Sequence, residues 1–186
     1  MFLRGWAVEL SELFKTRASR VQKVIDGLEG GAQGIVEFTS SDLKSKDELI
    51  KIHNLFPHGS EVVSYLYRVE LVGATKMVCE EVRSAFCRFQ QRNEFKLSRF
   101  NDDHPASECV YVGTSQDMFA RFRSHIGVGT GGSTYGLYLS KWAQGVNTSF
   151  RVEYSAFKTI EACDMELIEG VLWDSRKPMF GKKGGK

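Results

Sequence analysis

The 186-residue sequence lacks several features that would point to particular classes of protein. No apolar run approaches the ~18 residues that span a bilayer, which excludes a transmembrane helix. The first residues, MFLRGWAVELSELFK, include an early acidic residue and no long apolar run, so we expect no signal peptide and a cytoplasmic location. The four cysteines form no CxxC pair, and no histidine stands at zinc-like spacing. We therefore expect reduced, mostly buried thiols.

A strong charge of one sign is also absent, since the net charge is +2. This value neither indicates nor excludes a nucleic-acid partner, because a basic face can be offset by acidic residues elsewhere. Basic residues do gather locally, at Arg121 and Arg123 and in the last eleven positions, and such clusters fit either a solvated surface or a nucleic-acid contact. The glycine-rich loop 127–134 lacks the lysine of a phosphate-binding loop and follows a helix, which excludes nucleotide binding there.

Apolar periodicity predicts helices over about 6–28, 41–55, 74–91, 115–126 and 160–173, and strands over 34–38, 61–72, 109–113 and 150–157. Segment 137–143 fits a short helix or a strand. Phe86 and Phe89 are expected to lie in the core.

Three strands after residue 60 predict an α+β fold, with a small three-stranded antiparallel or mixed sheet flanked by helices. Residues 61–186 would form this domain, with a helical insertion at about 74–108. Residues 1–60 would be an N-terminal helix–strand–helix extension, a candidate for specificity, homodimer formation or packing.

Chemistry alone draws attention to the helix expected over 115–126. Arg121 and His125 are four residues apart and must share a face of that helix. Met118 and Phe122 make the same face partly apolar, which places the two polar residues at the edge of a site. The alternative is a surface arginine paired with Asp117, one turn earlier.

Glu169 stands in an apolar arc of the last helix, between Met165 and Leu172 on one side and Ala162 and Trp173 on the other. A carboxylate in such surroundings is costly unless it is protonated or paired with a cation. A metal ion or a structural salt bridge would each satisfy it, and both alternatives stay open.

Two stretches of the second half resemble motifs of the GIY-YIG nuclease family. VYVGTSQDMFARFRSH at 110–125 has a strand ending in Tyr-aliphatic-Gly and then a helix with an arginine ten positions after the tyrosine. These residues are Tyr111 and Arg121. Four positions further on stands His125, where several DNA-cutting members also have a histidine. MELIEGVLWDSRKPMFG at 165–181 resembles the closing motif, with Glu169 nine residues before a proline.

A third stretch, YLYRVEL at 65–71, resembles the opening strand of the family and places Tyr67 at its tyrosine. Tyr65 and Tyr67 share one face of that strand, so parity alone leaves either as the site tyrosine. The sequence departs from the family pattern at two positions. Tyr65 stands where the family has its opening glycine, and Gly181 stands where it has a terminal asparagine.

The resemblance implies a metal-dependent endonuclease that hydrolyses phosphodiester bonds, in DNA rather than RNA, by a single-metal mechanism. Glu169 would hold Mg²⁺ or Mn²⁺. Tyr67 or Tyr111 would take a proton from the attacking water, with its pKa lowered by Arg121 and the metal. Arg121 would also stabilise charge on the phosphoryl oxygens, and His125 would hydrogen-bond a tyrosine or the leaving side of the phosphate.

The resemblance also suggests which cations would contact backbone phosphates without reading bases: Arg123, Lys177, Lys182 and Lys183. Two other classes of function remain. One is a catalytically inactive module that binds nucleic acid or regulates, and retains the fold. The other is a protein-interaction domain whose motif matches arise by chance.

Overall fold

A computed structural model of the chain describes residues 12, 15, 16, 19, 22, 32–58, 64–104, 106–128, 135–158 and 160–183. The helix predicted over about 6–28 lies outside these residues, except for Glu12, Lys15, Thr16, Ser19 and Gln22, which are helical. Most of the glycine-rich loop 127–134 also lies outside them.

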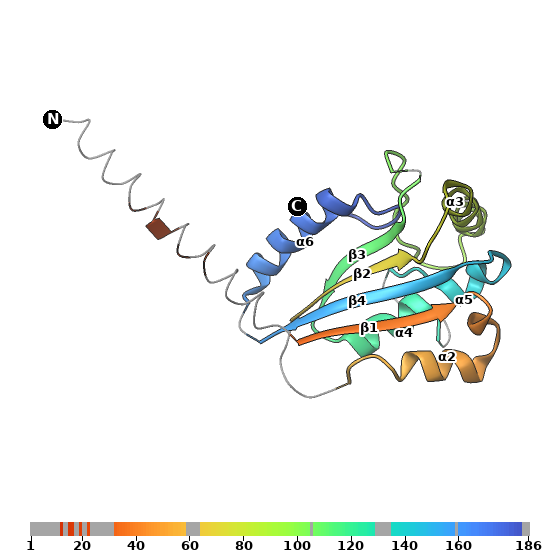
Figure 1. The fold of residues 1–186 in the computed structure, drawn as a ribbon, viewed down its shortest axis with the longest axis horizontal. Coiled ribbons are helices and arrows are strands. Elements are labelled where there is room, and N and C mark those ends of the chain that lie inside the picture. Colours follow the sequence, from red (N-terminus) through yellow and green to blue (C-terminus); the bar gives the residue numbers. More distant parts are fainter. Residues whose placement is uncertain are drawn as a thin grey trace.

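The described residues form an α+β fold, as the sequence predicts (Figure 1). The strands are β1 (Ala32–Thr39), β2 (Ser64–Leu71), β3 (Cys109–Ser115) and β4 (Ser149–Phe157). The helices are η1 (Asp42–Lys44), α2 (Lys46–His53), α3 (Lys76–Gln90), α4 (Met118–Ile126), α5 (Leu139–Trp142), η2 (Ala143–Gly145) and α6 (Ala162–Arg176). Segment 137–143 is therefore mainly helical, which resolves the alternative that the sequence left open.

The strands form one antiparallel sheet of four strands, in the order β1-β4-β2-β3. The prediction of three strands is wrong, because β1 pairs with β4 from Ala32 opposite Ala156 to Thr39 opposite Ser149. Figure 1 shows β1 and β4 side by side. Part of the segment assigned to an N-terminal extension thus belongs to the sheet that carries β2 and β3.

Each face of the sheet packs against different helices. Along β2, Tyr67, Val69 and Leu71 are buried on one face, where the Tyr67 ring meets Phe122 of α4 at a centroid distance of 5.2 Å. Helix α6 covers β2 and β3 from the opposite face (Figure 1). Because side chains alternate along a strand, a residue's parity decides which helix it meets.

Helix α3 forms the insertion that the sequence predicts between β2 and β3. Thr75 caps its first turn by accepting the Val78 backbone N–H at 3.4 Å. Phe86 and Phe89 are buried in the core, as expected from the sequence, with exposed fractions of 0% and 5%. Among the described residues, no helix is both long and apolar enough to cross a membrane.

Candidate active site

Helix α4 positions two of the predicted site residues. It begins after Asp117, whose carboxylate accepts the Ala120 backbone N–H at 2.8 Å and so satisfies a donor that the helix start leaves free. Arg121 and His125 then follow one turn apart on the same face, as predicted. The alternative of a surface pair between Arg121 and Asp117 is wrong, because Asp117 caps the helix and Arg121 bonds to other residues.

Arg121 is the centre of a hydrogen-bonded cluster. Its Nε donates to the Tyr67 hydroxyl at 2.7 Å and its Nη2 to the Tyr111 hydroxyl at 2.8 Å. Its Nη1 donates to the Tyr135 backbone carbonyl at 2.7 Å. No carboxylate among the described residues lies within ion-pair distance of the guanidinium. The positive charge is therefore balanced by oxygen dipoles and remains available to an anion.

His125 completes the cluster and approaches Tyr67 from a second direction. Its Nε2 lies 2.9 Å from the Tyr67 hydroxyl, and its Nδ1 lies 3.3 Å from the Leu137 backbone nitrogen. A backbone N–H can only donate, so Nδ1 must accept. Burial first, and then the charge of Arg121, lower the pKa of His125 well below its usual value, so the ring is neutral. The proton is then on Nε2, and the Tyr67 oxygen accepts two N–H bonds.

The pKa of Tyr67 is raised, whereas the sequence analysis expected positive charge to lower it. Tyr67 is 1% exposed, and burial raises its pKa well above 10. The neighbouring Tyr111 also raises the pKa, while the charge and hydrogen bond of Arg121 lower it by less. The expectation that Arg121 lowers the pKa is correct for that interaction, but burial outweighs it. The lowering expected from a bound metal stays a prediction. Desolvation outweighs a single nearby charge here, because the phenolate would lose nearly all its water.

Gly113 allows the two tyrosines to lie together. Their rings stack at a centroid distance of 6.0 Å. A Cβ at Gly113 would lie 2.7 Å from Tyr111 Cε1 and 2.8 Å from the Tyr67 oxygen. The glycine of the Tyr-aliphatic-Gly motif is therefore required by the rings that it faces.

Replacing Gly113 with alanine should displace both rings and destabilise the fold. We expect a loss of about 1–3 kcal/mol in the free energy of unfolding, as for other additions to a packed core. Urea unfolding measures this loss. Gly145→Ala is the matched control, since a Cβ there meets nothing within 4 Å. Equal stability of the two variants would show that the cluster tolerates the added methyl group.

Glu169 lies near the cluster but on the other face of β3. It is 9% exposed, and its Oε2 accepts a hydrogen bond from the Thr114 hydroxyl at 2.8 Å. Thr114 follows Gly113 and points towards α6, whereas Tyr111 points towards α4. Burial raises the pKa of Glu169, while the Thr114 bond and the charge of Arg121 lower it. Glu169 forms no salt bridge within the described part of the chain, so the predicted alternative of a structural ion pair finds no support there.

The structure thus brings four predicted residues, Tyr67, Tyr111, Arg121 and His125, into direct contact; we call these four the site cluster. Glu169 has no direct bond to them, but its charge influences the pKa of Tyr67. Four elements, β2, β3, α4 and α6, therefore contribute to one region at the β3 edge of the sheet.

The conformation and packing of Gly181 account for a glycine where the GIY-YIG pattern has an asparagine. Its φ is +103°, and a Cβ there would lie 2.7 Å from Tyr111 Cε2. An asparagine at this position would be strained and would collide with a ring of the site cluster. The position that the family fills with a side chain is therefore packed against Tyr111 in this protein.

Asn101 is a positioning residue that the sequence did not reveal. Its side-chain nitrogen donates to the Pro178 carbonyl at 2.9 Å, and its backbone nitrogen donates to the Met179 carbonyl at 2.9 Å. Asn101 holds the segment after α6 in place and is 9% exposed. It comes from a loop that composition marks only as irregular, so nothing in the sequence distinguished it from its neighbours.

The predicted nucleic-acid contacts are all on the surface but differ in their partners. Arg123, Lys177 and Lys182 are exposed. The ammonium of Lys183 bonds instead to the carboxylate of Asp174 on α6. Lys183 therefore has a structural partner, which a phosphate would have to displace.

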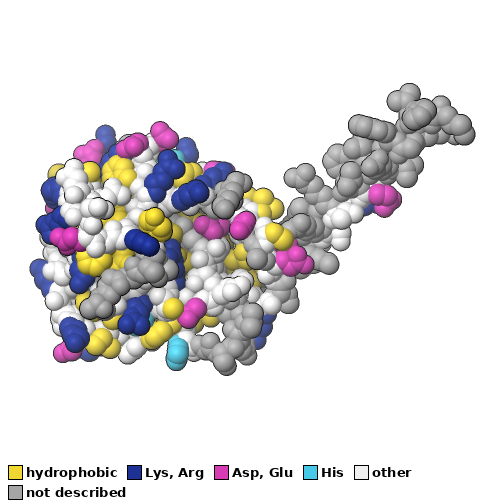
Figure 2. Space-filling view, turned by 180° about the vertical axis from the view of Figure 1, so that it is seen from behind, with side chains coloured by type: hydrophobic (Ala, Val, Ile, Leu, Met, Phe, Trp, Pro, Cys, Tyr) yellow, Lys and Arg dark blue, Asp and Glu magenta, His cyan; other side chains and the backbone are white. Residues whose placement is uncertain are grey.

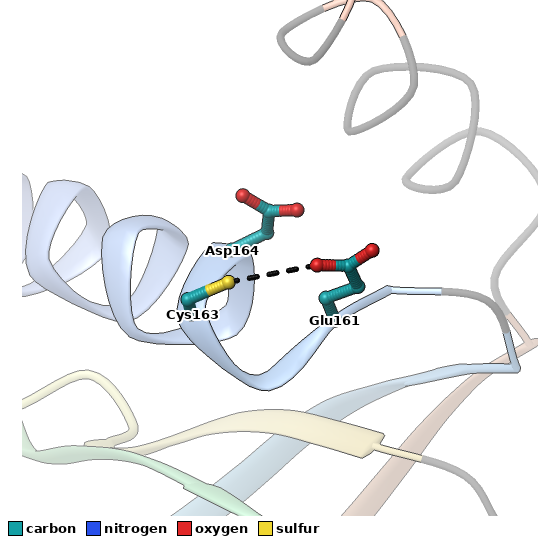
Figure 3. Close-up of side chains that lie close together, drawn as sticks. All are labelled: Glu161, Cys163 and Asp164. Carbon is teal, nitrogen blue, oxygen red and sulfur yellow. Dashed lines mark hydrogen bonds between the residues drawn. The ribbon is translucent and has the colours of Figure 1, made fainter.

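A second group of metal-binding residue types lies at the start of α6, away from the predicted ligand Glu169. Glu161, Cys163 and Asp164 bring their ligand atoms within 4.8 Å of one another, and the Cys163 thiol lies 3.7 Å from a Glu161 oxygen (Figure 3). A thiolate is a soft ligand, and Mg²⁺ prefers hard oxygen ligands. This group therefore does not support the predicted magnesium site. All four cysteines are free; Cys79 and Cys109 are buried, Cys87 is half-buried, and Cys163 is an exposed exception to the expectation of mostly buried thiols.

The neutral state of His125 makes stability depend on pH. Because its pKa is lowered in the folded state, the unfolded chain binds a proton first as the pH falls. Its contribution to stability is complete above about pH 6.5 and is lost below it. The free energy of unfolding should therefore be lower at about pH 5 than at about pH 7.5. Urea unfolding at the two pH values measures the fall.

His125→Gln is the control for this prediction, since glutamine does not titrate. The raised pKa of Glu169 acts in the opposite direction, because protonation then favours the folded state. The difference between wild type and variant cancels that contribution. An equal fall in both proteins would show that His125 is not the responsible group.

Comparison with known proteins yields no relative: no family model, no curated protein and no solved structure matches this chain.

Proposed function

We propose that this protein is a divalent-metal-dependent endonuclease of the GIY-YIG type that hydrolyses phosphodiester bonds in DNA. The observation that carries the proposal is the contact of Tyr67 and Tyr111 with the partly buried Arg121, and of His125 with Tyr67. Two separate sequence motifs, at 65–71 and 110–125, supplied these residues, and chance matches would have no reason to meet at one point. The grouping therefore favours a nuclease-like site over a protein-interaction domain with accidental motifs.

Arg121 would both organise the site and receive the phosphate. Its planar guanidinium donates three hydrogen bonds, which hold the two phenol oxygens and the Tyr135 carbonyl as acceptors around it. Its charge lacks a carboxylate partner among the described residues. A partly buried guanidinium of this kind stabilises negative charge that develops on phosphoryl oxygens, and it does so more strongly than an exposed one.

Glu169 fits the role of a magnesium ligand. Its carboxylate is buried, is held by the Thr114 hydroxyl, and has a pKa that burial raises. Mg²⁺ is commonly bound through one or two carboxylates, with water and substrate phosphates completing its shell. When bound, Mg²⁺ or Mn²⁺ would neutralise charge on the phosphate and lower the pKa of a water molecule.

In this proposal, the phenolate form of Tyr67 or of Tyr111 accepts the proton of the attacking water. The Tyr67 oxygen accepts two N–H bonds, which favours the phenolate, but burial keeps its pKa raised. Tyr111 accepts one bond from Arg121 and is 9% exposed against 1% for Tyr67. His125 positions Tyr67 through its Nε2–H and does not itself act as a base.

One observation favours the second candidate, an inactive module that binds nucleic acid. Tyr67 and His125 are 1% and 0% exposed, and a phenol with a raised pKa is protonated at neutral pH. In this case the site cluster would stabilise the fold, and Arg121 would hold a phosphate without cleavage. Binding that persists without any cleavage would distinguish this function.

A cleavage assay tests the proposal. The purified protein is incubated with single- and double-stranded DNA and RNA, with Mg²⁺, with Mn²⁺ or with a chelator. We expect DNA cleavage with the metals and none with the chelator. Tyr67→Phe should lose most of the single-turnover rate, because it removes a hydroxyl that joins Arg121 and His125. Tyr65→Phe is the matched control, two residues away on the same face of β2, and should retain most of the rate.

Absence of cleavage with every substrate and metal, together with tight binding, would replace the proposal with the inactive module. Absence of both would overturn the nucleic-acid class altogether. Loss of activity in Tyr65→Phe, and not in Tyr67→Phe, would show that the site tyrosine was assigned two residues too late.

A further inference from the structure

An aromatic side chain stands beside the site cluster and has no part in the proposed mechanism. Tyr135 is 64% exposed, and its ring makes no ring contact with another described residue. Its backbone is nevertheless held, because the carbonyl accepts the Arg121 Nη1 bond at 2.7 Å. One exposed aromatic residue means little alone. Tyr135 differs because its side chain is exposed to solvent while its backbone carbonyl is bonded to Arg121, the central residue of the candidate site.

The insertion between β2 and β3 runs past Tyr135. Gly136, the next residue, donates its N–H to the Lys96 carbonyl at 3.1 Å and accepts the Ser98 N–H at 3.0 Å. Segment 96–99 is thereby bonded alongside Tyr135. Lys96 is exposed, so it adds a cation on the Arg121 side of the cluster.

The same segment continues to the Tyr111 side of the cluster. The Arg99 carbonyl accepts the Gly181 N–H at 2.7 Å, and Gly181 packs against the Tyr111 ring. Arg99 and Lys182, which flank this contact, are both exposed. The insertion thus borders the site cluster from one side to the other.

Three cations therefore lie along the segment of the insertion that passes Tyr135 and the site cluster. Lys96, Arg99 and Lys182 have no carboxylate within ion-pair distance in the described part of the chain. In Figure 2, Lys and Arg side chains, with some Asp and Glu among them, lie mainly over the half of the molecule that carries α2, α3 and α5 (Figure 1). Unpaired surface cations around an aromatic ring provide the two contacts that single-stranded nucleic acid uses, phosphate attraction and base stacking.

We propose that this border, formed by Lys96, Arg99, Tyr135 and Lys182, binds an unpaired strand of nucleic acid and leads it to the site cluster. The inference rests on the proposed function, to which it adds the form of the substrate. The cations contact backbone phosphates, and one base stacks on Tyr135. A base in a duplex already has both faces stacked on its neighbours, so only an unpaired base can use the ring. The protein therefore prefers single strands, or duplex ends and junctions that expose them.

Binding in the presence of a chelator separates this inference from cleavage. The probes are a fluorescein-labelled single strand of thymidines and a blunt duplex of the same length, followed by fluorescence anisotropy. Wild type should bind the single strand more tightly than the duplex. Tyr135→Ala should weaken single-strand binding by about 5- to 100-fold, as for loss of one stacked base, and duplex binding by less than about twofold. Tyr135→Phe keeps the ring and should bind as wild type does.

The salt dependence tests the cations. A triple variant with glutamine at Lys96, Arg99 and Lys182 should bind more weakly, and its slope of log affinity against log salt should be smaller by about 2, since each phosphate contact on a single strand contributes roughly 0.7. The matched control replaces three exposed lysines of the α2 region with glutamine: Lys44, Lys46 and Lys51. It removes the same charge and should leave the slope nearly unchanged.

Three outcomes would overturn this inference and leave the proposed function standing. They are equal affinity of wild type for the two probes, an unchanged single-strand affinity of Tyr135→Ala, or equal salt slopes in the two triple variants. Each is compatible with a nuclease that acts on duplex DNA, so the proposed function would survive. Failure of wild type to bind either probe would overturn the inference and the proposed function together.

Discussion

Glu169→Gln should reduce metal-dependent cleavage by about 10³-fold, the equivalent of roughly 4 kcal/mol of transition-state stabilisation. The substitution removes the charge that would bind Mg²⁺ and keeps the volume of the side chain. The Gln carbonyl can still accept the Thr114 bond that Glu169 accepts at 2.8 Å. Because Glu169 is buried with a raised pKa, we expect folding stability to be unchanged or increased.

The measurement is the single-turnover rate across a range of Mg²⁺ concentrations, with binding followed separately in chelator. Glu166→Gln is the matched control, because Glu166 is exposed on the same helix, one turn earlier. It should cleave at nearly the wild-type rate. Full activity of Glu169→Gln with an unchanged metal dependence would remove Glu169 from the site.

Arg121→Lys should lose ~10²-fold or more in cleavage rate, the effect expected when a donor to transition-state charge is removed. Arginine donates from three nitrogens to Tyr67, Tyr111 and the Tyr135 carbonyl. Lysine has one nitrogen and cannot span three acceptors held by three separate segments. Because the positive charge is kept, a loss of rate would come from the changed arrangement of hydrogen-bond donors.

Single-turnover rates measure this loss, and thermal unfolding shows whether the variant folds. Arg123→Lys is the control, since Arg123 lies two residues away on α4, is exposed, and keeps as lysine the charge predicted to contact phosphate. It should retain the wild-type rate. Normal cleavage by Arg121→Lys would mean that the site cluster is structural, as the inactive module requires.

Local patterns predicted most elements of the fold. The apolar and β-branched run at 61–72 predicted β2, and the spacing of Phe86 and Phe89 predicted the buried side of α3. These predictions succeed because strand alternation and helical periodicity relate neighbours in the chain. The relation of Arg121 to His125 succeeds for the same reason, since a four-residue spacing on a helix is geometrically constrained.

Contacts between residues far apart in the chain were harder to predict from the sequence. The place of β1 in the sheet depends on its pairing with β4, which lies more than a hundred residues further along the chain. No local pattern in the sequence indicates such a pairing. The roles of Asn101 and Tyr135 depend on where two irregular loops lie in space. Composition identifies loops, but it does not say which of their backbone groups meet a site.

By itself, the sequence determined the residue types of the candidate site, the helix that carries Arg121 and His125, and the strands that carry Tyr67 and Tyr111. Only the tertiary structure decided that these side chains meet, that Leu137 selects the tautomer of His125, and that the pKa of Tyr67 rises. The physical reason is that helix and strand geometry are set by neighbouring residues. Desolvation and hydrogen-bond partners depend instead on everything that packs around a group, wherever it lies in the chain.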